Sequence, residues 1–246
     1  MIQTVEERSL NAWPSLQQLL DDGWILRFAN GYTRRANSVN PMYGETQEVR
    51  HKIRRCTQRY LDRNLRPVFR ITPLAYPPNL DELLDTLGFS RQSPTSVQIL
   101  DLASLPAPAT DTLQIWSEFS PEWEEHFVQL NGHYAAQRDT HQAILRNIVP
   151  EKCFAALSDA KGKVVACGLG VGENDYVGLF DIITAQHARR KGYGQALILN
   201  ILDWAKRKGA KKAYLSVEIG NRPALNLYAK LGFLEIYRYW YRVKEA

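Results

Sequence analysis

The most informative segment of the 246-residue chain reads Ala185-Gln186-His187-Ala188-Arg189-Arg190-Lys191-Gly192-Tyr193-Gly194-Gln195. It follows a strand-like run that ends at Thr184, and it opens into a helix predicted over 194–208. Gly192 and Gly194 permit close backbone approaches that a Cβ atom would block. The free N–H groups at a helix N-terminus suit a pyrophosphate, and three consecutive cations add charge for its oxygens. The segment predicts a phosphate-binding loop, although taken alone it is also compatible with an ordinary glycine-containing turn.

A second segment lies downstream and strengthens this interpretation. Arg189 to Gly194 resembles the acetyl-CoA loop of the GNAT acetyltransferase superfamily, Gln/Arg-x-x-Gly-x-Gly/Ala. The run from Asn221 to Phe233 resembles that family's Asn-x-x-Ala-x-x-x-Tyr-x-x-x-Gly-Phe, with Tyr228 at the tyrosine position. Two motifs in register make the resemblance specific over 150–246, and a weaker resemblance extends back to 113. It implies an α/β fold with a central mixed sheet flanked by helices.

The resemblance also implies an activity, the transfer of an acyl group from acetyl-CoA to a primary amine. It implies that Tyr228 protonates the departing thiolate as a general acid, whereas a helix tyrosine considered alone more often only packs. No metal is implied. The residues implied to bind acetyl-CoA are Ile182, Ile183, Thr184, Arg189, Arg190, Lys191, Gly192, Tyr193, Gly194, Gln195 and Asn221.

The general base is left open by the sequence. Some family members carry a glutamate on the strand before the loop, but that position is Gly178 here. Asp181 lies on the same strand, and strict alternation would put it on the opposite face from residue 178. The remaining candidates are a water relay and three carboxylates: Glu173, Asp175 and Glu218.

The first half repeats the order of elements of the second, including a Leu-Gly-Phe run at 87–89 and again at 231–233. Its opening segments, 11–14, 22–24 and 36–41, resemble bacterial tandem GNAT proteins. A Pro- and Ala-rich linker at 103–110 separates a degenerate GNAT-like domain (1–104) from an active domain (111–246).

Degeneracy of the first half is inferred from two departures. The segment 40–45 lacks the glycine pair and its cations, and Leu84 stands where Tyr228 stands in the second half. We expect this half to pack on the active domain and to shape the acceptor pocket. Arg34 and Arg35 would then be placed to meet an acidic group of the substrate, although solvent-exposed arginines are the default interpretation.

The expected elements follow from hydrophobic periodicity and turn residues. Strands are predicted at 23–28, 33–39, 67–72, 95–102, 113–116, 153–157, 164–170, 176–184, 213–218 and 233–243. Helices are predicted at 45–65, 80–87, 121–130, 137–148, 194–208 and 223–231.

Composition excludes several classes of protein. Hydrophobic residues make up 45% and charged residues 23%, as in ordinary globular chains. There is no signal-peptide pattern or membrane-length apolar run, and three scattered cysteines favour a reducing, cytoplasmic location. The net charge of +5 permits an anionic partner, and a basic run at 50–70 is interpreted as a solvated helix face, since no motif indicates nucleic-acid binding.

A small-molecule amine is the favoured acceptor, because the second half-domain could close over the site. A protein N-terminus or lysine, and a non-catalytic acyl-CoA sensor, are the alternatives. A homodimer is left open.

Overall fold

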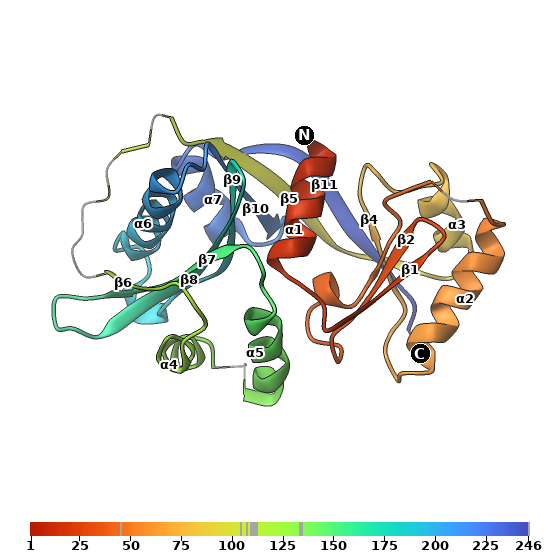
Figure 1. Ribbon diagram of the computed structural model, residues 1–246, viewed down its shortest axis with the longest axis horizontal. Coiled ribbons are helices and arrows are strands. Elements are labelled where there is room, and N and C mark those ends of the chain that lie inside the picture. The colour runs from red at the N-terminus through yellow and green to blue at the C-terminus, as the bar shows by residue number, and fades with distance from the viewer. Residues whose placement is uncertain (45, 104, 107, 109–112, 133–134, 246) are drawn as a thin grey trace.

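The computed structural model describes residues 1–44, 46–103, 105–106, 108, 113–132 and 135–245 (Figure 1). The helices are α1 (Ile2–Ala12), α2 (Val49–Leu61), α3 (Leu80–Thr86), α4 (Pro121–Leu130), α5 (Arg138–Arg146), α6 (Tyr193–Arg207) and α7 (Arg222–Lys230). The strands are β1 (Gln17–Asp21), β2 (Trp24–Phe28), β3 (Val39–Asn40), β4 (Val68–Ile71), β5 (Ser90–Asp101), β6 (Leu113–Trp116), β7 (Glu151–Ser158), β8 (Val164–Glu173), β9 (Tyr176–Thr184), β10 (Lys212–Glu218) and β11 (Leu234–Val243).

All of these strands belong to one mixed sheet, in the order β1-β2-β3-β4-β11-β5-β10-β9-β8-β7-β6. The order shows an exchange between the two halves of the chain. The last strand of the first half, β5, pairs with β10 of the second half. The last strand of the second half, β11, pairs with β4 of the first half, and β5 and β11 pair with each other. The expected mixed α/β sheet is confirmed.

The two Leu-Gly-Phe runs have the same local geometry. Each follows a helix, α3 or α7, and each glycine has a positive φ, +82° at Gly88 and +89° at Gly232. The amide of Phe89 donates to the carbonyl of Leu84 at 3.0 Å, as the amide of Phe233 does to Tyr228 at 3.0 Å. Leu84 and Tyr228 therefore occupy equivalent positions in the two halves.

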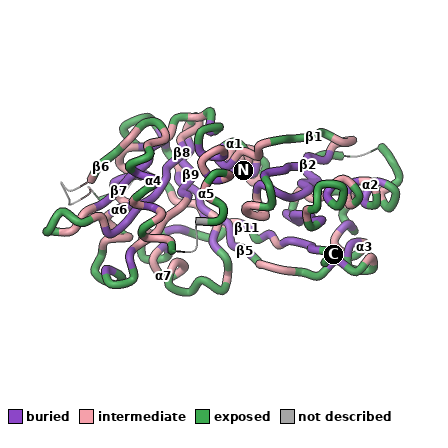
Figure 2. The backbone as a smooth tube through the Cα atoms, turned by 90° about the horizontal axis from the view of Figure 1, so that it is seen from below, coloured by how far each residue is buried: buried purple, intermediate pink, exposed green. Residues whose placement is uncertain are grey.

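Helices cover both faces of the sheet. In the second half, α6 packs on one face of β7, β8 and β9, and α4 packs on the other face of the same strands. Strands β8 and β9 are therefore buried along most of their length (Figure 2). In the first half, α2 and α3 enclose a separate cluster that contains Trp24, Phe69 and Tyr60.

Three details of the first half differ from the sequence-based expectation. The predicted strand at 33–39 is wrong: a 3-10 turn, η1 (Arg34–Ala36), occupies its middle, and of this range only Val39 lies in a strand. Thr33, with φ +53°, caps this turn, and the Asn37 side chain accepts from the Ala29 amide at 2.7 Å. Helix α2 is shorter than predicted because Glu48 accepts from the amides of Arg50 and His51 and sets its start. Helix α1 and strand β1 were not predicted.

The proposed division of the chain at 104 and 111 falls at residues outside the described part, so it stays a prediction. Among the described residues, no helix combines the length and the apolar character that crossing a membrane requires.

Candidate active site

Strands β9 and β10 run parallel and then separate. They pair only over three residues of each strand, from Tyr176 to Gly178 on β9. Beyond Gly178, β9 continues to Thr184 with β8 on one side only. Backbone N–H and C=O groups along 179–184 therefore have no strand partner on the β10 side in the described chain. Such groups require hydrogen bonds from another source, and the predicted pantetheine contacts Ile182, Ile183 and Thr184 lie on this edge.

The loop after β9 leads into the N-terminus of α6. Gly192 is the N-cap residue, with φ +87° and no side-chain cap. Gly194 approaches the preceding strand closely, since a Cβ there would lie 3.1 Å from Thr184 Oγ1. The first amides of α6 lack intrahelical acceptors, and with the exposed cations they form an anion-binding surface. The exposed cations are Arg189, Arg190 and Lys191. The neutral Gln195 is also exposed, and Tyr193 is partly buried.

The second motif builds helix α7 beside this loop. Asn221 is the N-cap of α7, and its side chain accepts from the Ala224 amide at 3.3 Å. Leu227 Cδ2 lies 3.4 Å from the position of a Cβ at Gly194, which brings α7 against the start of α6. Tyr228 is buried on α7 and packs edge-on against Phe233. Burial raises the pKa of Tyr228 to about 12, so its hydroxyl is protonated at neutral pH.

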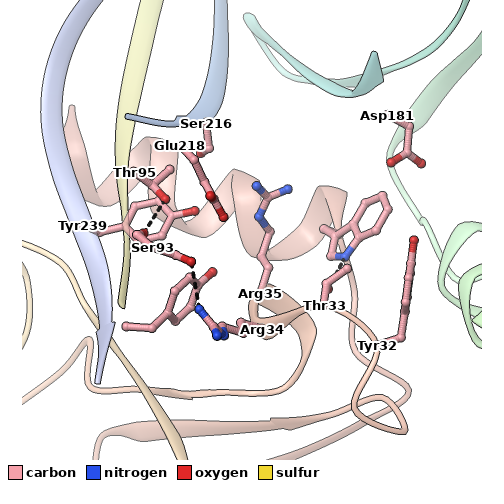
Figure 3. Close-up of a pocket in the computed structure, with 12 residues that line it drawn as sticks. Tyr32, Thr33, Arg34, Arg35, Ser93, Thr95, Asp181, Ser216, Glu218 and Tyr239 are labelled. Carbon is pink, nitrogen blue, oxygen red and sulfur yellow. Dashed lines mark hydrogen bonds between the residues drawn. The ribbon is translucent and has the colours of Figure 1, made fainter. Parts of the chain in front are cut away.

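A cavity of about 510 Å³ lies between the two halves (Figure 3). The first half contributes one wall, from the α1–β1 connection and η1: Trp13, Tyr32, Thr33, Arg34 and Arg35. The shared strands and the second half contribute the other walls: Ser93, Thr95, Asp181, Ser216, Glu218, Tyr239 and Tyr241. Sequence reasoning did not identify the aromatic and hydroxyl residues of this cavity, because they come from five segments far apart in the chain.

Asp181 faces this cavity, and the alternation argument about it was wrong. The register between β8 and β9 shifts between the pairs Leu169–Phe180 and Cys167–Ile183, and Asp181 has φ +49° at that point. A β-bulge of this kind redirects the side chains that follow it. The Asp181 Oδ2 atom lies 2.8 Å from Nε2 of His141, which is fully buried on α5. Rings of Trp13, Tyr32 and Phe127 surround the imidazole.

The three carboxylates left open by the sequence lie in different surroundings. Glu173 accepts from the Asn11 side chain at 3.2 Å, and Asp175 lies 3.7 Å from Arg8. Both therefore take part in contacts between α1 and the β8–β9 turn. Glu218, at the end of β10, lines the cavity.

Positive charge gathers on the wall opposite Asp181. Arg34 donates to Ser93 Oγ at 2.8 Å and to Gln92 Oε1 at 2.6 Å. Arg35 extends into the cavity, and its buried Nε has no hydrogen-bond partner. Burial works to lower the pKa of Arg35, but the neighbouring Tyr239 and Tyr241 hydroxyls outweigh this effect and raise it. The guanidinium therefore stays charged.

Among the phenols of the cavity wall, Tyr239 is the one whose pKa is lowered. Burial works to raise its pKa, but the charges of Arg35 and Arg70 outweigh burial and lower the pKa to about 8. Arg70 lies over the Tyr239 ring, 3.9 Å from its centroid, and pairs with buried Glu6. The described residues contain no group of three or more side chains suited to a metal ion.

Comparison with known proteins identifies the family. The sequence profile described as "Probable histone acetyltransferase Rv0428c C-terminal" matches residues 1–242. An "Uncharacterized N-acetyltransferase YobR" of Bacillus subtilis (strain 168) is 28% identical over 251 residues, which cover 99% of this chain and 98% of the relative.

Two solved structures share the fold over nearly the whole chain. A GCN5-related N-acetyltransferase from Kribbella flavida has a TM-score of 0.74 at 14% identity, covering 99% of this chain and 95% of that one. A tandem GNAT protein from the clavulanic acid biosynthesis pathway has a TM-score of 0.65 at 16% identity, covering 98% and 88%. At these identities the likeness concerns the fold alone. The chain belongs to the family described as "Probable histone acetyltransferase Rv0428c C-terminal", and with it to the GNAT superfamily of N-acetyltransferases.

Proposed function

We propose that this acetyltransferase uses acetyl-CoA to acetylate a primary amine of a small molecule, with Tyr228 as the general acid. The observation that carries the proposal is the separation of β9 from β10 next to the uncapped N-terminus of α6. The separated strand offers a free edge to an extended chain that carries amide groups, such as the pantetheine arm. The helix N-terminus offers an anion-binding end to a pyrophosphate. Both features lead toward the cavity that holds Asp181.

The residues present fit acetyl-CoA. The amides at the start of α6 and the cations from Arg189 to Lys191 would hold the phosphates. The backbone of Ile182, Ile183 and Thr184 would bind the pantetheine arm, and Asn221 would support the cofactor from α7. Acetyl-CoA would supply the activated thioester acyl group.

Proton movements at the two ends of the reaction require an acid and a base. A thiol has a pKa near about 8.5, so a phenol that is protonated at neutral pH has a proton to share as charge develops on sulfur. Tyr228, with its pKa of about 12, meets this requirement. For the amine, Asp181 is the proposed proton acceptor, held in place by His141 at 2.8 Å.

A small acceptor is supported by the position of the first half. A cavity of about 510 Å³ lies within the range of small-molecule sites, and η1 and Trp13 form one of its walls. A protein acceptor is the second candidate, because the matching family is described as a histone acetyltransferase. A peptide substrate would need the cavity mouth to admit a chain in both directions.

Calorimetric titration with acetyl-CoA tests the proposal. We expect one site per chain in the wild type and loss of binding in Gly192→Asp, which adds negative charge at the anion-binding end. Gly209→Asp is the matched control. Gly209 lies just beyond the other end of α6 with a similar φ of +97°, and neither glycine has an atom near its would-be Cβ. Two sites would mean that the first half is not degenerate, and absence of binding would overturn the proposed function.

A further inference from the structure

We propose that the acceptor amine also carries an anionic oxyacid group, a carboxylate or a phosphate, and that Arg35 binds this group. The inference rests on the proposed acetyltransferase function and specifies the substrate class of the same cavity. It assigns a recognition role to a side chain of the first half, which contributes nothing to the acetyl-CoA motifs.

Among the described residues, Arg35 forms no ion pair with a carboxylate, although it lies beside the buried Arg70. Arg34 is engaged by Ser93 and Gln92. Arg70, deeper in the wall, forms an ion pair with Glu6 in which both side chains are at most 1% exposed. The groups that act on the Arg35 charge are the Tyr239 and Tyr241 hydroxyls, the first of them also through a hydrogen bond, and the like charge of Arg70. The guanidinium carbon of Arg35 lies 5.5 Å from the centroid of the Phe180 ring.

A charged group that is partly withdrawn from water without an opposite charge is costly, and a bound anion removes this cost. The planar guanidinium matches the geometry of carboxylates and phosphates, which it binds through two parallel hydrogen bonds. Arg35 projects from η1 into open cavity space, between Glu218 on one side and Asp181 on the other (Figure 3). The Arg35 guanidinium and the Asp181 carboxylate thus place opposite charges toward two ends of the cavity, with Glu218 on the far side of Arg35 from Asp181.

The two ends define the orientation of the acceptor. Asp181 immediately precedes Ile182 and Ile183 on β9, where the thioester is expected. An amine at Asp181 would therefore lie next to the acyl donor, while the anionic group of the same molecule reaches Arg35. The volume of about 510 Å³ limits the acceptor to a molecule of amino-acid or amino-sugar phosphate size.

The experiment measures acetyl-CoA-dependent thiol release with matched acceptors. The panel contains a primary alkylamine, the ω-amino acid and the aminoalkyl phosphate of the same chain length, each at several lengths. The two anionic series distinguish a carboxylate from a phosphate. We expect kcat/KM for one anionic series to exceed that of the alkylamine by about 10- to 100-fold, the range of a charge-assisted hydrogen-bond pair.

Variants then assign the preference to Arg35. Arg35→Met should abolish the preference by lowering kcat/KM for the anionic acceptor about 10- to 100-fold while leaving the alkylamine rate within a few-fold. Arg35→Lys keeps the positive charge but lacks the two parallel N–H donors of the guanidinium. It should retain part of the preference that Arg35→Met loses. Arg50→Met, on the exposed side of α2, removes the same net charge and should change neither rate.

The outcomes separate this inference from the proposed function. Binding of acetyl-CoA with equal turnover of charged and uncharged amines would overturn the inference alone. So would an equal loss for all acceptors in Arg35→Met and Arg35→Lys, which would make Arg35 a structural part of the cavity wall. Absence of acetyl-CoA binding by the wild type would overturn the proposed function, and the inference with it.

Discussion

His141 Nε2 lies 2.8 Å from Asp181 Oδ2, and this contact joins helix α5 to the bulge of β9 at the point where the strand leaves β10. The imidazole is completely buried, whereas the carboxylate reaches the cavity. A buried histidine thus fixes the orientation of a carboxylate that the acceptor amine would meet.

Replacing Asp181 tests its role as proton acceptor. We expect Asp181→Asn to lower kcat/KM by about 10²- to 10⁴-fold, because the amide cannot take up the amine proton. The affinity for acetyl-CoA should stay unchanged in calorimetry. Asp175→Asn, at the turn of the same hairpin and paired with Arg8, is the control and should retain activity. Full activity of Asp181→Asn would show that Asp181 is not the proton acceptor and would leave Glu218 and a water molecule as the candidates.

Replacing His141 tests positioning rather than chemistry. His141→Phe keeps an aromatic ring within the cage of Trp13, Tyr32 and Phe127 but removes the contact with Asp181. A misplaced reactive group costs up to about 10²-fold in rate, so we expect a loss of that order in kcat. His141→Gln retains a hydrogen-bond donor and should recover part of it. Equal kcat values in His141→Phe and His141→Gln would show that the hydrogen bond from residue 141 does not position Asp181.

Replacing Tyr228 tests the general acid. We expect Tyr228→Phe to lower kcat by about 10²- to 10⁴-fold with little change in KM for acetyl-CoA. Since burial holds the pKa of Tyr228 at about 12, wild-type kcat should show no loss from this group up to about pH 11. Thioester analogues with a more acidic leaving thiol need less protonation, so they should reduce the difference in kcat between Tyr228→Phe and the wild type. An unchanged kcat would exclude the acid role.

The Tyr239 phenol gives the cavity a pH dependence. Its pKa of about 8 lies below the ordinary value, so the group is neutral below pH 8 and becomes an anion above it. The phenolate would neutralise Arg35, and KM for an anionic acceptor should therefore rise as the pH passes about 8. Ultraviolet difference absorbance should detect one tyrosine ionising in this range. Tyr239→Phe should remove both the absorbance step and the rise in KM.

The pair of Glu6 and Arg70 predicts a stability effect outside the reaction. Both side chains are almost fully buried, and the Tyr237 hydroxyl also donates to Glu6. Removing one partner of such a pair costs about 3–5 kcal/mol. We expect Glu6→Gln to reduce the free energy of unfolding by a value near that range in urea titrations. Glu151→Gln, which breaks an exposed pair with Lys208, should cost about 0–1 kcal/mol.

The sequence was most informative where local chemistry determines structure. Gly192 at the N-cap of α6, Gly194 in its first turn and the glycines of the two Leu-Gly-Phe runs each suit a particular backbone geometry, and these elements are present. The confirmed parts are the family and the mixed α/β sheet. The assignments of acetyl-CoA contacts and of Tyr228 stay predictions.

The cavity could not be derived in the same way, because its residues meet only through tertiary structure. Trp13 and Arg35 line the same cavity as Asp181 because the two halves exchange the strands β5 and β11. No local sequence pattern encodes that exchange. The orientation of Asp181 depends on a one-residue bulge in β9, and a bulge reverses the outcome of an alternation argument. Helix α1 was missed because its buried face contains polar Glu6 and Ser9 beside Val5 and Ala12, and the burial of Glu6 depends on its pairing with Arg70.

The position of β11 between β4 and β5 has a consequence for biosynthesis. The first half leaves the ribosome long before residues 234–243 exist, and until then β4 and β5 each lack a neighbour on the sheet. Such open edges invite pairing with other chains, so the nascent protein needs protection or delay before it can close its sheet. The same arrangement prevents gene fission, because neither half encodes a complete set of strands. A first half that binds no acetyl-CoA would therefore still be indispensable for the sheet.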